Sequence, residues 1–301
     1  MKGMERNNSE FAKNYYWGKL RYDELRVVLE QIDFPYVILK GEVLSVYMNN
    51  QVATRGSNDV DILVDKSNIG ALTKILKNSG FESSKEEKRE DLIYYLTFAH
   101  QIAPYRKRKG SNDIYVDINF DLFWGGYQGR RIDINSFLED AITMNIYGVN
   151  VKTLPLYKTL IALILHHYKD FNSIFLLASS KSITEKKIME IYCLIVNNIE
   201  RFVISEFIEL CGRYGVQQYA YYMLYYVNEF CRHSNRVICE IVEKVWCAEG
   251  EALLNVYGLE KKHTWKIDFF QRLNNDNLFE EIRADLSPDE LRQISTCSEF
   301  Y

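Results

Sequence analysis

The chain has 301 residues, 47% of them hydrophobic, and a formal net charge of −4. This length suits one large domain or two ordinary ones, and the composition is that of a globular protein with a packed core. The weakly acidic balance excludes a global positive field for nucleic acid and leaves only a local basic patch open. The polar N-terminus lacks a signal core, and no apolar run reaches the ~20 residues of a membrane helix, so no membrane association is expected.

All six cysteines lie in the C-terminal half, and no two of them form a Cys-x-x-Cys pair. This spacing excludes the usual zinc sites built from cysteine. It favours buried thiols in a reducing compartment over disulfides, which predicts a cytoplasmic protein. The six residues are Cys193, Cys211, Cys231, Cys239, Cys247 and Cys297.

The first part of the chain reads as a helix followed by a strand and a second helix. Residues 1–34 are expected to form an N-terminal helical segment, with apolar residues at helical spacing over Ser9–Gln31. Pro35 breaks this helix, because the residue before a proline disfavours helical geometry. The short apolar run Tyr36–Leu39 is typical of a strand, and Glu42–Asn49 has the pattern of a helix.

Three strands and one helix are expected next. Asp59–Val64 alternates between polar and apolar residues, which indicates a strand. Ser67–Ser79 has apolar residues at helical spacing. Ile93–Tyr105 and Asp113–Phe123 are expected to form a hairpin, joined by a charged turn with glycine at its tip.

After Pro155 the pattern becomes helical to the end of the chain. We therefore expect an α+β protein: a small mixed sheet flanked by helices over residues 35–154, then an all-helical C-terminal domain over 155–301. The expected helices are Leu156–Tyr168, Glu185–Asn198, Arg201–Tyr214, Val216–Cys231, Asn235–Cys247 and one beginning at Ser287.

Acidic residues on the predicted strands are the strongest chemical signal. Asp59 and Asp61 lie two residues apart, so their side chains leave the same strand face ~7 Å apart. Carboxylate oxygens are the ligands that Mg²⁺ prefers, and a third carboxylate from a neighbouring strand would complete a two-metal site. Alternation puts Asp113, Asp117 and Asp121 on one face of their strand, and the central position of Asp117 favours it.

An Asp-x-Asp pair alone is weak, because two solvated acids at a strand end give the same pattern. The surrounding residues favour catalysis. Gly41 follows a predicted strand and precedes a helix, so its neighbouring N–H groups are suited to phosphate. Lys40 adds a positive charge beside it, and Arg55 and Ser57 come just before the acids.

These residues form a recognisable pattern: Leu-Lys-Gly at 39–41, followed by Arg-x-Ser-x-Asp-x-Asp at 55–61. The pattern resembles the polymerase β-type nucleotidyltransferase superfamily, and is most similar to the bacterial nucleotidyltransferases known as type 5. It also resembles the toxins of abortive-infection systems. The resemblance covers residues 36–124, with a weaker similarity in Leu160–Tyr168.

The resemblance implies a role for each of these residues. Asp59, Asp61 and Asp117 would be catalytic residues that bind Mg²⁺ or Mn²⁺ in a two-metal mechanism. The remaining residues would bind the NTP, and they are Lys40, Gly41, Arg55 and Ser57. The sequence departs from the general pattern in two respects: the gap between the glycine and the acids is long, and no serine adjoins the glycine. Asn119 stands where type 5 relatives often carry a histidine.

The predicted function is transfer of a nucleotidyl group from an NTP to a hydroxyl or phosphate of an acceptor. Similarity to type 5 enzymes suggests a modified ribosomal peptide as acceptor, and similarity to the toxins suggests tRNA. A non-catalytic module that binds nucleotide is the alternative. The oligomeric state is not indicated.

Three further groups have both a structural and a functional interpretation. His166 and His167 are read as one buried and one exposed helix residue, or as residues near the nucleotide; adjacent helix positions point ~100° apart, which disfavours a shared metal. The basic run Arg106–Lys109 is either solvated or contacts the acceptor. The run Phe123–Tyr127 is read as core and turn, with base stacking as the alternative.

Overall fold

The structure is a computed structural model that divides the chain into two compact units, Met1–Ala162 and Leu163–Tyr301. Each unit is described by itself. The structure describes all residues except 1, 86–87, 89–91, 93–94, 97–98, 124–130, 179–181 and 298–301.

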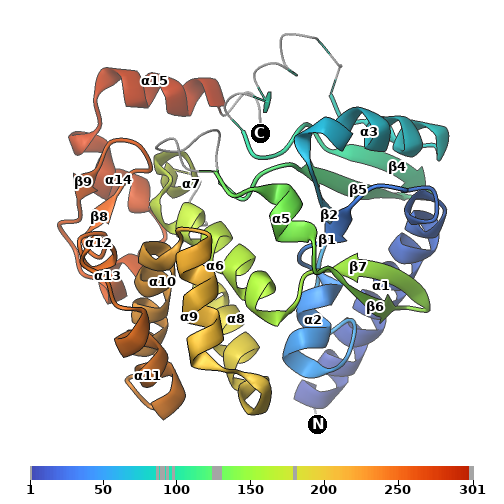
Figure 1. The fold of residues 1–301 in the computed structure, drawn as a ribbon. Coiled ribbons are helices and arrows are strands. Elements are labelled where there is room, and N and C mark those ends of the chain that lie inside the picture. The colour runs from blue at the N-terminus through green and yellow to red at the C-terminus, as the bar shows by residue number, and fades with distance from the viewer. Residues whose placement is uncertain are drawn as a thin grey trace. The chain divides into compact units, whose positions relative to one another are not determined.

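The first unit is built on a seven-stranded mixed sheet, in the order β3-β4-β5-β2-β1-β7-β6 (Figure 1). Strand β2 runs antiparallel to β1 and parallel to β5, and β1 pairs in parallel with β7. This confirms the predicted α+β fold with a mixed sheet. The strands are β1 (Tyr36–Ile38), β2 (Asp59–Val64), β3 (Glu82–Ser83), β4 (Tyr105–Lys109), β5 (Asn112–Asn119), β6 (Ile142–Ile146) and β7 (Val149–Thr153).

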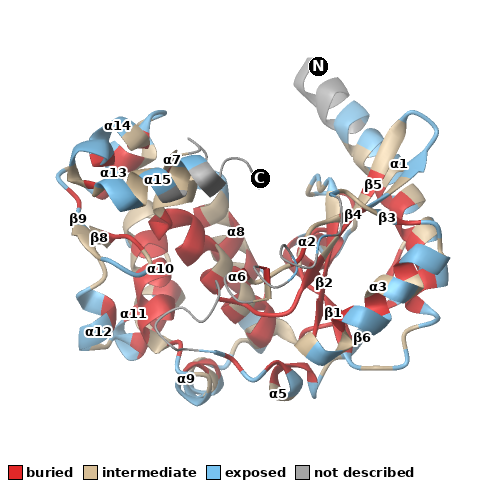
Figure 2. Ribbon diagram, turned by 90° about the horizontal axis from the view of Figure 1, so that it is seen from above, coloured by how far each residue is buried: buried red, intermediate tan, exposed pale blue. Residues whose placement is uncertain are grey.

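Helices pack on this sheet and bury its apolar residues. Val60 and Ile62 of β2 and Val116 of β5 are almost fully buried, as Figure 2 shows for the central strands. Leu25 and Leu72 are fully buried on the long first helix and on α3. The helices are α1 (Lys2–Leu29), α2 (Glu42–Asn49), η1 (Lys66–Asn68), α3 (Ile69–Asn78), α5 (Ile134–Leu138) and the start of α6 (Leu156–Asn172).

The predicted strand Ile93–Tyr105 is wrong over most of its described residues, although its last residue, Tyr105, begins β4 and Gln101 forms an isolated bridge with Asn119. Tyr95 and Leu96 are helical, and the strand that pairs with β5 is β4, which begins at Tyr105. Gly110, at φ +62°, and Ser111 form a two-residue turn, the tightest that joins antiparallel strands. The basic run therefore lies within a strand and not in a turn.

The hairpin of β6 and β7 was not predicted from the sequence. Its five pairs run from Ile142↔Thr153 to Ile146↔Val149. Val149 and Val151 are buried, whereas most of β6 is half-buried or exposed. The edge strand therefore carries little of the hydrophobic alternation by which strands are recognised.

The second unit is mostly helical, as predicted, and also contains a short hairpin of β8 (Val256–Tyr257) and β9 (His263–Thr264). Most of α10 is buried (Figure 2). Its helices are the rest of α6, α7 (Ile174–Ala178), α8 (Glu185–Val196), η3 (Ile199–Arg201), α9 (Ile204–Arg213), α10 (Gln217–Phe230), α11 (Arg236–Val245), α12 (Ala248–Glu251), α13 (Phe269–Leu273), α14 (Leu278–Ile282), η4 (Arg283–Asp285) and α15 (Pro288–Cys297).

Aromatic residues and one buried arginine form the centre of the second unit. Tyr168 packs against Tyr219 and Tyr222, with ring centroids 4.6 and 5.0 Å apart. Arg272 is 1% exposed and donates a 2.9 Å hydrogen bond to the Tyr226 hydroxyl. The many tyrosines of this half thus serve packing, because the ring is apolar and the hydroxyl finds a partner.

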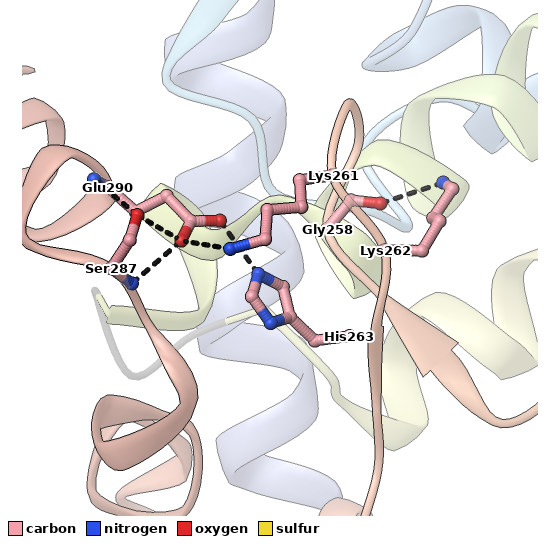
Figure 3. A network of polar contacts seen from close by, with 6 residues as sticks. All are labelled: Gly258, Lys261, Lys262, His263, Ser287 and Glu290. Carbon is pink, nitrogen blue, oxygen red and sulfur yellow. Dashed lines mark hydrogen bonds and ion pairs between the residues drawn. The ribbon is translucent and has the colours of Figure 1, made fainter.

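A polar network ties α15 to the β8–β9 hairpin (Figure 3). Glu290 accepts hydrogen bonds from the main-chain N of Ser287 at 2.8 Å and from His263 Nε2 at 2.7 Å, and Lys261 lies 3.4 Å away. Burial works to raise the pKa of Glu290, but these hydrogen bonds outweigh it and hold the pKa at about 2. The carboxylate is therefore ionised at neutral pH and caps the helix start.

Two expectations about the whole chain can be compared with the structure. No helix among the described residues is long and apolar enough to cross a membrane. The five cysteines whose side chains are described are free thiols.

Candidate active site

The parallel pairing of β2 with β5 brings carboxylates of two strands together. Asp61 is directly paired with Asp117, and Asp59 is paired with Tyr115. Adjacent strands lie ~4.8 Å apart and paired residues point to the same face. Asp59, Asp61 and Asp117 therefore share one face of the sheet, with Asp117 beside Asp61.

The other two acids of this segment lie elsewhere. Asp113 pairs with Arg108 of β4. It has no partner in β2, because the first residue of that strand, Asp59, pairs with Tyr115. β5 ends at Asn119, so the predicted strand to Phe123 is too long and Asp121 lies outside it. The carboxylate of Asp121 accepts hydrogen bonds from the main-chain N of the next two residues, at 2.7 and 3.0 Å. Of the three candidates, Asp117 is the one level with Asp61.

The acids repel one another, and two neighbours offset part of the charge. Burial, followed by the charges of Asp61 and Asp59, raises the pKa of Asp117 to about 7. Lys40 Nζ lies 3.1 Å from Asp61 Oδ1, and the Asp61 residue is only 7% exposed. Asn119 donates to the same oxygen at 3.3 Å. A concentration of negative charge that carries one neutralising lysine is a site suited to a cation.

The glycine between β1 and α2 approaches the loop before the acids. Gly41 has φ +60°, and a Cβ there would lie 3.3 Å from Ser57 Oγ. Ser57 Oγ in turn lies 2.9 Å from the main-chain oxygen of Asp59 and 3.1 Å from its Oδ1. Because a side chain at position 41 is disfavoured by conformation and by space, glycine keeps the start of α2 open beside the acids.

A buried glutamate that sequence reasoning did not single out positions this loop. Glu42 is 2% exposed and accepts hydrogen bonds from the Ala53 main-chain N at 2.7 Å and from the Tyr147 hydroxyl at 2.9 Å. The main-chain N of Arg55 donates to Ser45 at 3.1 Å. The loop is thus fixed to α2 by buried polar groups, although an acid in the first turn of a helix is ordinarily solvated.

Arg21 of α1 also reaches the loop, with Nη2 2.5 Å from the Ser57 main-chain oxygen. This arginine is 7% exposed. Nothing in the helical pattern of the N-terminal segment distinguished it from the surface charges around it. Asn119, by contrast, was signalled by alternation, which places it on the acidic face with Asp117.

The two histidines lie in the second unit. His167 is buried with Nε2 3.1 Å from Glu190, and burial lowers its pKa, whereas the side chain of His166 is 30% exposed. Asp170 lies 3.5 Å from His166 and 2.8 Å from Lys187. Potential ligand atoms of both histidines and Asp170 lie within 4.8 Å of one another, closer than helix geometry alone led us to expect.

The chain shows similarity to solved structures and to a protein family. The solved structures that resemble it include an antigenic nucleotidyltransferase-like protein from Paracoccidioides brasiliensis, at 21% identity over 62% of this chain and 76% of that one, with a TM-score of 0.36. Another is the antibiotic-resistance factor ANT(2'')-Ia, at 12% identity over 72% and 97%, with a TM-score of 0.37. A search of curated proteins gave no match. A family model described as "Uncharacterised nucleotidyltransferase" matches residues 17–232, more than half of the chain. The chain therefore belongs to this nucleotidyltransferase family, as its sequence motifs predict.

Proposed function

We propose that this protein is a metal-dependent nucleotidyltransferase that uses Asp59, Asp61 and Asp117 as its catalytic carboxylates. The observation that carries the proposal is the direct pairing of Asp61 with Asp117 across β2 and β5. The pairing supports the proposal because it puts carboxylates from two neighbouring strands on one face of the sheet, where a shared cation would draw them together.

The donor set fits Mg²⁺ or Mn²⁺. All three side chains offer the hard oxygen ligands that these ions prefer. The raised pKa of Asp117 supports the same conclusion, because a third carboxylate beside two others is unfavourable until a cation balances it. When bound, such ions supply charge neutralisation for the triphosphate and the attacking oxygen.

The residues around α2 are suited to the triphosphate. The N-terminus of α2 has no side-chain cap and carries a positive partial charge, and Gly41 leaves room for phosphate oxygens. Lys40, which contacts Asp61, has its charge where the phosphates would lie. Ser57 and Arg55 complete this side of the proposed site, Ser57 by its contact with Asp59 and Arg55 by its place in the fixed loop.

The reaction proposed is nucleotidyl transfer from an NTP to a hydroxyl or phosphate of an acceptor, in the cytoplasm. In this reaction the acceptor oxygen forms a bond to the α-phosphorus of the NTP. The bond to the β-phosphate breaks, pyrophosphate leaves, and the proton of the acceptor passes to solvent. A modified ribosomal peptide and tRNA are the two acceptor classes that the sequence resemblance suggests.

The test is a screen of the four NTPs, labelled at the α-phosphate, against cellular RNA and small peptides with Mg²⁺ or Mn²⁺. Transfer of label by the wild-type protein, and its loss in Asp61→Asn, would support the proposal. Asp113→Asn is the matched control, because this acid lies on the same strand outside the β2–β5 pairing. Binding of NTP without label transfer to either acceptor class would instead favour a non-catalytic nucleotide-binding module.

A further inference from the structure

The strand β4 divides its basic residues between the two faces of the sheet. Arg106 pairs with Tyr115 and Arg108 with Asp113, whereas Lys107 pairs with Ile114 and Lys109 with Asn112. Paired residues share a face, and successive residues alternate. The arginines therefore lie on the face of Tyr115 and the catalytic acids, and the lysines lie on the opposite face.

The two lysines are engaged in the packing of helices on their face. Both contact Glu24 of α1, with Lys107 Nζ at 2.8 Å and Lys109 Nζ at 2.5 Å. Lys107 also donates to the main-chain oxygen of Ser79 at 2.9 Å and lies over the Phe81 ring. Hydrogen bonds from both lysines lower the pKa of Glu24. Both lysines therefore have an ion-pair partner within the fold, although the Lys109 side chain is 49% exposed.

The two arginines differ from the lysines in this respect. Both are exposed, and neither forms an ion pair or side-chain hydrogen bond within the part of the chain that the structure describes. Asp113 is the strand partner of Arg108, but no salt bridge between their side chains is found among the described residues. Two guanidinium groups ~7 Å apart on one strand face thus remain available for an anion.

The order of the strands places these arginines on one side of the acids and the proposed NTP-binding residues on the other. Across this part of the sheet the strands lie in the order β4, β5, β2 and β1. Arg106, Tyr115 and Asp59 lie opposite one another on three adjacent strands, so the Cα atoms of Arg106 and Asp59 are ~10 Å apart. Lys40 follows β1, on the far side of β2. A transfer reaction needs donor and acceptor on opposite sides of the reacting phosphorus.

We infer that Arg106, Arg108 and Tyr115 form an acceptor strip, which binds the phosphodiester backbone of a single-stranded polynucleotide whose terminus is the acceptor. The inference rests on the proposed function. Repeated guanidinium groups bind successive phosphates, and the partly exposed Tyr115, opposite Arg106 on the neighbouring strand, offers a surface for base stacking. A peptide acceptor supplies neither repeated phosphates nor bases, and a polycationic acceptor is repelled.

The experiment measures binding of a fluorescent single-stranded RNA oligonucleotide with a free 3′ end by anisotropy, in EDTA and over a range of NaCl concentrations. Arg106→Gln/Arg108→Gln is expected to reduce the slope of log K against log salt by about 1.4, from two lost phosphate contacts at ~0.7 each. Tyr115→Ala is expected to weaken binding about tenfold with the slope retained.

The matched control is Lys107→Gln/Lys109→Gln, which makes the same change of charge in the same strand on the opposite face. It should keep the wild-type slope. Because this variant loses the contacts with Glu24, Lys74→Gln/Lys77→Gln on exposed positions of α3 serves as the second control.

Three results would overturn the inference: no binding of RNA by the wild type, equal slopes in the arginine and control variants, or loss of NTP affinity in the arginine variant that matches its loss of RNA affinity. The last result would assign the strip to the phosphates of the NTP. Because RNA binding is measured without turnover, the Asp61→Asn variant should bind RNA as the wild type does. Label transfer by that variant would contradict the proposed function and leave the strip intact.

Discussion

Replacement of Asp117 by asparagine should stabilise the metal-free protein while removing its activity. Burial and the charges of Asp61 and Asp59 raise the pKa of Asp117 from 3.8 to about 7. That difference corresponds to about 4 kcal/mol of unfavourable energy for the ionised carboxylate, as an upper limit. Discounted for the partial solvation of this carboxylate, the energy is about 2 kcal/mol, or a rise in Tm of about 4–8 °C at pH 8.

The sign of the pH dependence follows from the same values. The folded state keeps the proton of Asp117 over a range in which the unfolded state has lost it, so the stability of the wild type should fall as pH rises from about 4 to about 7. Asparagine has no proton to lose, so the variant should lack this decline. Thermal unfolding followed by circular dichroism in EDTA, from pH 4 to 8, measures both effects.

Added metal and NTP should reverse the order of stability at pH 8. The wild type gains binding energy from ions that its three carboxylates share, and Asp117→Asn retains two of them. The reasoning is refuted if the variant is less stable than the wild type in EDTA at pH 8, or if the two proteins show parallel pH profiles. Equal gains on addition of Mn²⁺ and NTP would remove Asp117 from the metal site.

Three other changes test the surroundings of the site and the second unit. Gly41→Ala introduces a Cβ at φ +60° and 3.3 Å from Ser57 Oγ, so calorimetry should show a Kd for NTP raised at least tenfold, which is a loss of about 1.4 kcal/mol of binding free energy. Unchanged affinity would leave the glycine a turn residue only. The pKa of Glu290 is held at about 2, so its stabilising effect is present above about pH 4.5 and is lost as the pH falls toward 2. Glu290→Gln should therefore lower the free energy of unfolding by about 1–2 kcal/mol at pH 7 and make the protein less sensitive to acid. Superimposable acid-unfolding curves of the wild type and the variant would contradict this. Burial lowers the pKa of His167, so below its ordinary pKa of 6.5 the unfolded state binds a proton more readily, and the stability of the protein falls as the pH decreases. His167→Gln should remove this part of the pH dependence. An unaltered pH profile would show that His167 does not cause it.

Local patterns in the sequence were sufficient for β2, which carries Asp59 and Asp61, and for α2. The strand Asp59–Val64 and the helix Glu42–Asn49 are observed with the bounds predicted for them. Each has a periodicity that one buried side imposes, and each is bounded by turn residues. The glycine at position 41 was likewise recognisable, because it stands between a strand and a helix.

Contacts between distant segments could not be predicted from the sequence. Alternation placed Asp113 and Asp117 on one strand face, but the register of β5 against β2 chooses between them. Glu42 contacts Tyr147, 105 residues away, and no local pattern encodes such a pair. Buried polar groups of this kind are visible only once the tertiary structure satisfies them.

The position of a single turn changed the interpretation of the basic run Arg106–Lys109. The charged residues before Gly110 suggested a solvated loop, because charge and glycine together are typical of turns. A two-residue turn at Gly110 and Ser111 instead extends β4 through Lys109. Strand alternation then separates the arginines from the lysines, which a loop would not have done.

The most direct test of the account is release of pyrophosphate from an NTP in the presence of Mn²⁺ and cellular RNA, measured for the wild type, Asp61→Asn and Asp113→Asn. The account predicts acceptor-dependent release by the wild type, most of that activity in Asp113→Asn, and none in Asp61→Asn, because Asp61 lies between Asp59 and Asp117 on the shared face. Equal release by the wild type and Asp61→Asn would contradict the central claim that these carboxylates form the catalytic site.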